Sequence, residues 1–246
     1  MTKIDAFTMR KCFSSSSLSS PLSLSSLSNV FNFLYSSAFL NSFDYLAFSF
    51  TFHFRLDYPS TEGDLVNVVF LLDTSSGVNR GDFRKEKEFV KSMVRSLDAR
   101  LKESKMAAIP YGAFPVTSGA LNSYQSLSEF DRDVDALQVI GGQRRMDEAL
   151  NAATNMLRRE KSPARSIVIL FTADRQAQLY QGLLVRDSSK TLRNVGAEIY
   201  VIAIGSETSF DGLRPIVAEP EDIYQVGSFD HLQREAQPIG RDIGSK

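Results

Sequence analysis

Apolar residues beyond position 63 follow two alternating patterns. Continuous apolar runs at 66–72 and 166–172 are typical of strands buried on both faces of a parallel sheet. Between and after them, apolar positions recur every three or four residues at 83–101, 146–157 and 183–195, as on one face of a helix. This alternation predicts an α/β fold: a Rossmann-like, doubly wound, mostly parallel central sheet with helices on both faces.

Shorter signals complete the predicted order of elements. Further strands are expected at 106–114, near Ala120, at 197–205 and from 222, followed by a closing helix that contains His231. Asp82 can cap the first helix, and Ser126 with Glu129 has the spacing of a capping box. Gly196 can end the helix before it in a left-handed conformation.

The first 63 residues differ in composition from the rest. Residues 12–43 carry no charge and consist mainly of Ser, Leu, Phe and Asn, which is low complexity. Serine recurs too often there for a membrane span. Phenylalanines alternate with polar residues at 48–56, as on a strand with one apolar face, and 59–63 has the composition of a linker. We therefore divide the chain into a segment 1–63, with a targeting role, a strand or a poorly ordered extension left open, and a domain 64–246.

Charge and reactive residues exclude several classes of function. The 28 Lys and Arg balance 29 Asp and Glu, so the basic surface of a nucleic-acid-binding protein is absent. The single cysteine, Cys12, precedes the domain and cannot form an internal disulfide. With two histidines in the chain and no paired carboxylates of matching context, acid–base and nucleophilic catalysis lack their residues. We expect no enzyme activity.

A carboxylate and three hydroxyls follow the first strand directly. Asp73 is followed by Thr74, Ser75 and Ser76, and then by a turn at Gly77. Ligands of open α/β sheets bind at the carboxyl ends of strands, so this is the expected functional edge. The plainer interpretation is that the hydroxyls only cap the turn.

The motif resembles the first half of the metal-ion-dependent adhesion site of von Willebrand factor type A domains, Asp-x-Ser-x-Ser. Further landmarks occur in the family's order from 64 to about 243: DFRKEKEFVKSMV, IGGQRRMDEALNAA, SIVILFTADRQ, VGAEIYVIAIG and SFDHL. The closest similarity is to collagen-associated and matrilin-like domains of the extracellular matrix. The resemblance implies a secreted, non-enzymatic module that binds collagen or another matrix protein through its loops. An intracellular scaffold subunit with the same fold is the alternative.

The resemblance also implies a divalent cation bound by three loops, and this sequence departs from the expected ligands in each loop. Gly77 replaces the second serine, Gln143 stands where threonine is expected, and Ala173 replaces the third-loop aspartate. The remaining direct ligands are Asp73, Ser75 and a displaced Asp174, with Gln143 as an additional oxygen donor. Since Mg²⁺ requires near-octahedral oxygen ligands, we expect no cofactor or weakly bound Mg²⁺ or Mn²⁺.

An arginine is the alternative partner for Asp73. A buried aspartate needs a compensating charge, and either Arg144 or Arg145 can reach into the vacated cation position. The residues expected to contact a partner protein are Thr74, Ser76, Gln143, Arg144, Arg145 and Arg175.

Overall fold

The computed structural model describes residues 65–97, 104–160, 164–173, 179–206 and 208–246. The predicted segment 1–63, with its alternating phenylalanines, lies outside these residues, and so do Asp174 and Arg175. No helix in the described part of the chain has the length and apolar character needed to cross a lipid bilayer.

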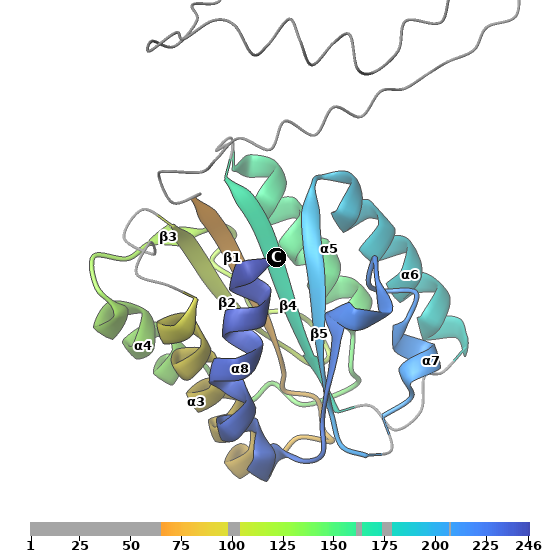
Figure 1. Ribbon diagram of the computed structural model, residues 1–246. Helices are drawn as coiled ribbons and strands as arrows, with labels where there is room; N and C mark the ends of the chain where they lie inside the picture. Colours follow the sequence, from red (N-terminus) through yellow and green to blue (C-terminus); the bar gives the residue numbers. More distant parts are fainter. Residues whose placement is uncertain (1–64, 98–103, 161–163, 174–178, 207) are drawn as a thin grey trace, which may run out of the picture. The chain divides into compact units, whose positions relative to one another are not determined.

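A six-stranded sheet with the order β3-β2-β1-β4-β5-β6 forms the centre of the described domain (Figure 1). All neighbouring strands are parallel except β2 and β3. The strands are β1 (Val66–Asp73), β2 (Lys105–Tyr111), β3 (Asn122–Ser123), β4 (Arg165–Thr172), β5 (Ala197–Ile204) and β6 (Ile223–Val226).

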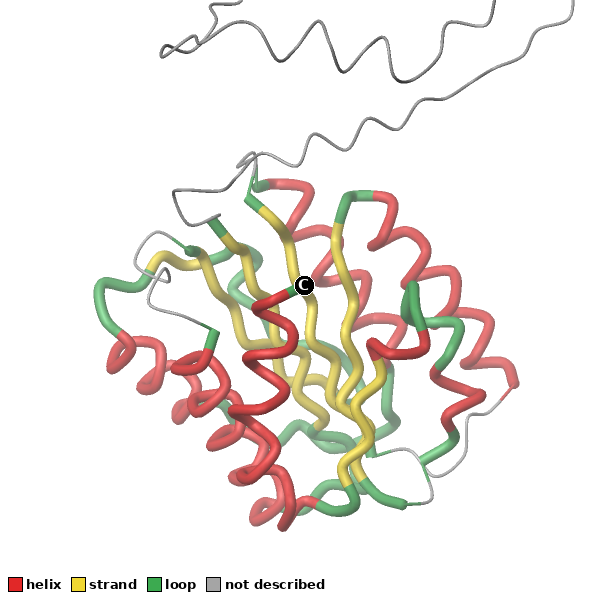
Figure 2. The backbone as a smooth tube through the Cα atoms, in the orientation of Figure 1, coloured by secondary structure: helices red, strands yellow, loops and turns green. Residues whose placement is uncertain are grey.

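Helices cover both faces of this sheet, as Figures 1 and 2 show. One face packs on α3, α4 and α8, and the other on α5, α6 and α7. The helices are α3 (Arg80–Ser96), α4 (Leu127–Ala136), α5 (Met146–Arg159), α6 (Leu179–Asn194), α7 (Phe210–Leu213) and α8 (Leu232–Ser245), with short 3-10 turns at Pro220–Asp222 and Phe229–His231. The predicted doubly wound α/β architecture is confirmed.

The two central strands are mainly apolar because both of their faces are covered. Successive side chains of β1 point to opposite faces, so Val68 and Phe70 join one core and Val69 and Leu71 join the other. All four are fully buried. Burial of each such side chain contributes about 1.5–3 kcal/mol, which explains why the continuous apolar runs predicted these strands well.

Element ends differ from the predictions where several polar residues compete. Asn79, not Asp82, caps α3: its Oδ1 accepts hydrogen bonds from the N–H groups of Gly81 and Asp82. The capping box at Ser126 does not form, because Glu129 accepts from the N–H of Gln125 instead. Residues 112–114 lie beyond the end of β2, and α6 begins before position 183. Gly196 does have a left-handed conformation, with a φ of 86°.

Arg165, the first residue of β4, lies beside both ends of the described domain. Its N–H donates to the carbonyl of Leu65 at 3.0 Å, and its Nη1 lies 3.4 Å from the carbonyl oxygen of Ile243 in α8. Its guanidinium also pairs with Glu198 of β5. The beginning of β1 and the end of α8 therefore lie at the edge of the sheet where the parallel strands begin.

Candidate functional site

The topological switch point of the sheet lies between β1 and β4. From β1 the chain winds outward to β2 on one side and returns to β4 on the other. Loops that follow neighbouring strands at such a point diverge and leave a crevice where ligands bind. The segments that lie at this point are the loop after β1, the loop before α5 and the residue after β4.

Backbone hydrogen bonds join the first two of these loops. The N–H of Gly141 donates to the carbonyl of Thr74 at 2.8 Å, and the N–H of Ser76 donates to the carbonyl of Gly142 at 3.0 Å. The Ser76 hydroxyl accepts from the N–H of Gly142 at 2.8 Å, and these two residues are 66 positions apart in the sequence. Two distant segments are thus held together by contacts within the protein itself.

Glycines permit this close approach. Gly141 and Gly142 have φ values of 77° and 79°, which residues with a side chain rarely adopt. A Cβ on Gly112 would lie 2.3 Å from the carbonyl oxygen of Gly141. The glycine pair that the sequence placed before α5 is therefore a packing requirement of the loop junction.

Asp73 and Arg144 form a largely buried ion pair where these segments meet. Arg144 Nε donates to Asp73 Oδ2 at 2.5 Å. The aspartate is fully buried, and the arginine side chain is 16% exposed. The second carboxylate oxygen accepts from the N–H of Ser75 at 2.9 Å, and the N–H of Ala173, after β4, lies 3.3 Å from Oδ2. All three loops therefore meet at one carboxylate.

The neighbouring Arg145 has different partners. Its guanidinium donates to both carboxylate oxygens of Asp147, at 2.9 and 2.8 Å, and to Glu148 at 2.8 Å. These contacts hold Arg145 at the start of α5, and they lower the pKa of Asp147 against the opposing effect of its partial burial. Of the two arginines left open by the sequence, Arg144 is the one that reaches Asp73.

A second carboxyl group lies buried near the pair. Glu86 of α3 is fully buried, and neither of its oxygens accepts a hydrogen bond from the described residues. Burial raises its pKa well above the ordinary value, and the charge of Asp73 raises it further. Glu86 therefore keeps its proton to a higher pH than an exposed glutamate does.

Tyr111, the last residue of β2, contacts both β4 and the loop after β1. Its ring is fully buried, and its hydroxyl donates to the carbonyl of Phe171 at 2.6 Å. Its own carbonyl accepts from both the N–H and the hydroxyl of Thr74. Thr74 is consequently fully buried, and its hydroxyl faces β2 rather than solvent.

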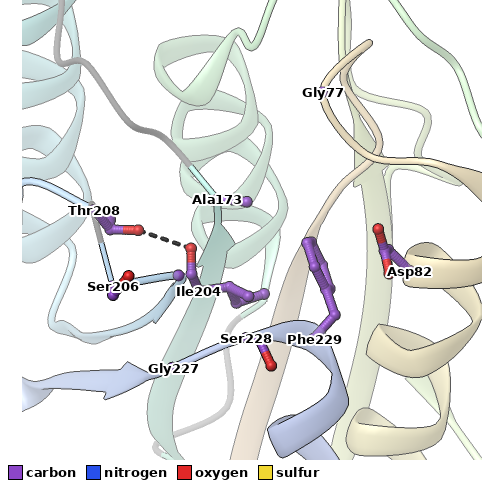
Figure 3. Close-up of a pocket in the computed structure, with 10 residues that line it drawn as sticks. Gly77, Asp82, Ala173, Ile204, Ser206, Thr208, Gly227, Ser228 and Phe229 are labelled. Carbon is purple, nitrogen blue, oxygen red and sulfur yellow. Dashed lines mark hydrogen bonds between the residues drawn. The ribbon is translucent and has the colours of Figure 1, made fainter.

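A recess of about 330 Å³ opens between the loop after β1 and the ends of β5 and β6 (Figure 3). It extends from Gly77 and Ala173 toward the ends of β5 and β6, and its walls are mainly polar. The Thr208 hydroxyl in its wall donates to the carbonyl of Ile204 at 2.7 Å. The lining residues are Gly77, Asp82, Ala173, Ile204, Gly205, Ser206, Thr208, Gly227, Ser228 and Phe229.

This chain belongs to the von Willebrand factor type A family. The family model for that domain matches residues 67–237. The collagen alpha-1(XXI) chain of Xenopus laevis is 24% identical over 167 residues, covering 68% of this chain and 17% of its own length. Matrilin-2 of Mus musculus is 24% identical over 196 residues, covering 74% and 20%. The chain thus spans about a fifth or less of these two curated relatives.

Solved structures show the same fold. Proximal thread matrix protein 1 from the mussel byssus superposes with a TM-score of 0.63 at 21% identity, covering 72% of this chain and 48% of that one. Another structure of that protein, with a TM-score of 0.61, 21% identity and coverage of 74% and 46%, is described as having a zinc-occupied metal-ion-dependent adhesion site.

The oxygen donors of this chain, as they lie, do not fit the divalent cation that the family implies. Asp73 Oδ2 already faces the positive charge of Arg144. At 4 Å, two unit charges interact by about 4 kcal/mol at an effective dielectric constant of 20, so a divalent ion beside the guanidinium would be repelled by roughly twice that. Gly77 offers no hydroxyl, and Gln143 is exposed. Among the described residues, the buried hydroxyls of Ser75 and Thr172 have no hydrogen-bond partner, and Ser75 is the one that the family pattern counts as a ligand.

The structure also identifies residues that the sequence analysis did not single out. Phe114, predicted to be part of a strand, is 57% exposed in the loop that follows β2, beside Ala113, whose N–H donates to Gly141. In the sequence, Glu86 is one of several consecutive charged residues at positions 84–88, so its burial was not expected. Its position three residues after Phe83 and four before Val90 places it on the apolar face of α3, and that spacing is the signal that could have revealed its burial.

Proposed function

We propose that this domain is a non-enzymatic protein-binding module of the extracellular matrix, which recognises a matrix protein such as a collagen through the loops at the carboxyl edge of its sheet. The observation that carries the proposal is the junction of three loops around Asp73, which gives a rigid surface at the switch point. Its collagen and matrilin relatives support the class of partner.

The exposed part of this surface combines an apolar anchor with polar groups. Phe114 supplies a largely exposed aromatic ring, and aromatic residues carry a large share of binding energy at protein interfaces. Ser76 and Gln143 are exposed on the adjoining loops. The recess beside Gly77 has the volume to receive one side chain of a partner. Thr74, counted from the sequence among the contacting residues, is left out because it is buried.

Binding to immobilised matrix proteins tests the proposal. The chain would be passed over a panel of purified collagens and non-collagenous matrix glycoproteins in a biosensor, with Phe114→Ala as the main variant. Leu183→Ala is the matched control, because Leu183 is 58% exposed on α6 and belongs to none of the three joined loops. We expect Phe114→Ala to weaken binding by about tenfold or more and Leu183→Ala to leave it unchanged.

The recess is tested separately by filling it. Ser206 is exposed at its rim, so Ser206→Trp blocks the opening without disturbing the core. Ser245→Trp places the same side chain at the far end of α8 as a control. If neither Phe114→Ala nor Ser206→Trp reduces binding, or if the chain binds no matrix protein in the panel, the proposed recognition surface is wrong.

A further inference from the structure

We infer that the Arg144 guanidinium is the resident cation of this site, in place of the divalent ion that the family fold implies. The three loops around Asp73 are then held together without a metal ion. The inference concerns how the site is assembled, and its direct test needs no partner protein.

The first argument is the position of the guanidinium. Arg144 Nε contacts Asp73 Oδ2, and its Nη2 lies 3.2 Å from the point that a Cβ on Gly77 would occupy. Position 77 is where the family resemblance expects the second hydroxyl. A serine there would press its side chain against the guanidinium, whereas glycine leaves the space that Arg144 uses. The loss of the hydroxyl at position 77 is therefore what gives the Arg144 guanidinium its space.

The second argument is charge. Asp73 is fully buried, and a buried carboxylate requires a compensating charge. Arginine is protonated at every accessible pH, so Arg144 supplies that charge permanently.

The third argument is that peptide groups already connect the loops. Gly141 and Gly142 bind Thr74 and Ser76 through three hydrogen bonds of 2.8–3.0 Å. The N–H of Ala173 brings the loop after β4 to the same carboxylate. An ion is not needed to gather these segments. Given the proposed function, partner binding through this edge needs neither a bridging cation nor an acidic partner residue to complete one.

The test is titration of the full chain with MnCl₂, by isothermal calorimetry and by thermal unfolding with MnCl₂ or EDTA. We expect no saturable heat in the millimolar range and the same Tm in both solutions. Arg158→Ala, which removes an exposed arginine from α5, the helix that follows Arg144, is the control and should behave identically. Micromolar binding of Mn²⁺ by the unaltered chain, or a Tm lowered by EDTA, would overturn the inference.

The opposite test uses a variant in which Arg144 is removed and the family's metal ligands are restored. Arg144→Ala, Gly77→Ser, Gln143→Thr and Ala173→Asp would be combined, removing the guanidinium and adding the missing oxygens. We expect this variant to bind Mn²⁺ and to gain roughly 5–10 °C in Tm at about 100 times its Kd. If the folded variant binds no Mn²⁺, Arg144 is not what keeps the ion out. Since the unaltered chain is titrated in parallel, a variant that fails to fold leaves the first measurement decisive.

The partner assay separates this inference from the proposed function. Binding to a matrix protein that persists unchanged in EDTA agrees with both. Binding abolished by EDTA and restored by Mn²⁺ would refute the resident guanidinium while leaving the binding function intact. Loss of binding in Phe114→Ala bears on the recognition surface alone.

Discussion

Removal of the Arg144 guanidinium should destabilise the fold strongly, because Asp73 would remain buried without a counter-charge. Breaking a buried ion pair by deleting one partner costs about 3–5 kcal/mol. Asp73 keeps its contacts with the N–H groups of Ser75 and Ala173, and Arg144 is 16% exposed, so we expect the lower end, about 3 kcal/mol, for Arg144→Ala. For a domain of this size that corresponds to a Tm lower by roughly 6–12 °C.

A double-mutant cycle measures the pair itself. Urea unfolding at pH 7, followed by circular dichroism, would compare Arg144→Ala, Asp73→Asn and the double variant. In the double variant the neutral amide that replaces the carboxylate should recover part of the loss, giving a coupling energy of about 2 kcal/mol or more between the two positions. Arg95→Ala, which breaks the more exposed pair with Asp131, is the control and should cost about 0–1 kcal/mol. A cost below about 1 kcal/mol for Arg144→Ala, or no coupling, would refute the reasoning.

Three further substitutions test the surroundings of the pair. Gly112→Ala forces a Cβ against the Gly141 carbonyl and should lower the free energy of unfolding by about 1–3 kcal/mol in urea titrations; an unchanged midpoint would contradict the close approach. Tyr111→Phe removes the buried hydrogen bond to Phe171 and should cost about 1–2 kcal/mol in the same assay, with a neutral result arguing against that bond. Glu86→Gln should stabilise the domain increasingly as pH rises. The pKa of Glu86 in the folded state lies above 4.5, so above pH 4.5 the folded protein keeps a proton that the unfolded chain releases. The unaltered protein therefore loses stability relative to the variant between pH 4.5 and the folded pKa, by up to about 1.4 kcal/mol per pH unit. Equal pH dependence of the two proteins would show that Glu86 is not buried in its acid form.

The central strands were predictable because burial on both faces leaves a direct mark on the sequence. The apolar runs that form β1 and β4 are typical of strands covered on both faces, and both lie at the centre of the sheet. Gly196 was equally direct, since a left-handed helix end strongly favours glycine. The cap of α3 was not predictable in the same way, because Asn79 and Asp82 are both good acceptors and the helix start decides between them.

The centre of the site was only partly predictable. The sequence showed that the ligands of the family's cation had changed and offered two arginines as substitutes. Arg144 was selected by contacts that no local pattern encodes: Arg145 is held by two acidic residues of its own helix, and the pair with Asp73 joins positions 71 residues apart. Phe114 is exposed because β2 ends at Tyr111, whereas the sequence pattern continued the strand to position 114.

The contacts of Arg165 with the carbonyls of Leu65 and Ile243 have a consequence for how such a domain can be built into a longer polypeptide. The backbone enters and leaves the domain at the edge opposite Asp73. A module joined at either end would therefore lie at the edge where the parallel strands begin and would leave the loops around Asp73 exposed. In several linked copies of the domain, each set of loops would be accessible, so weak contacts at each copy would combine into a higher overall affinity.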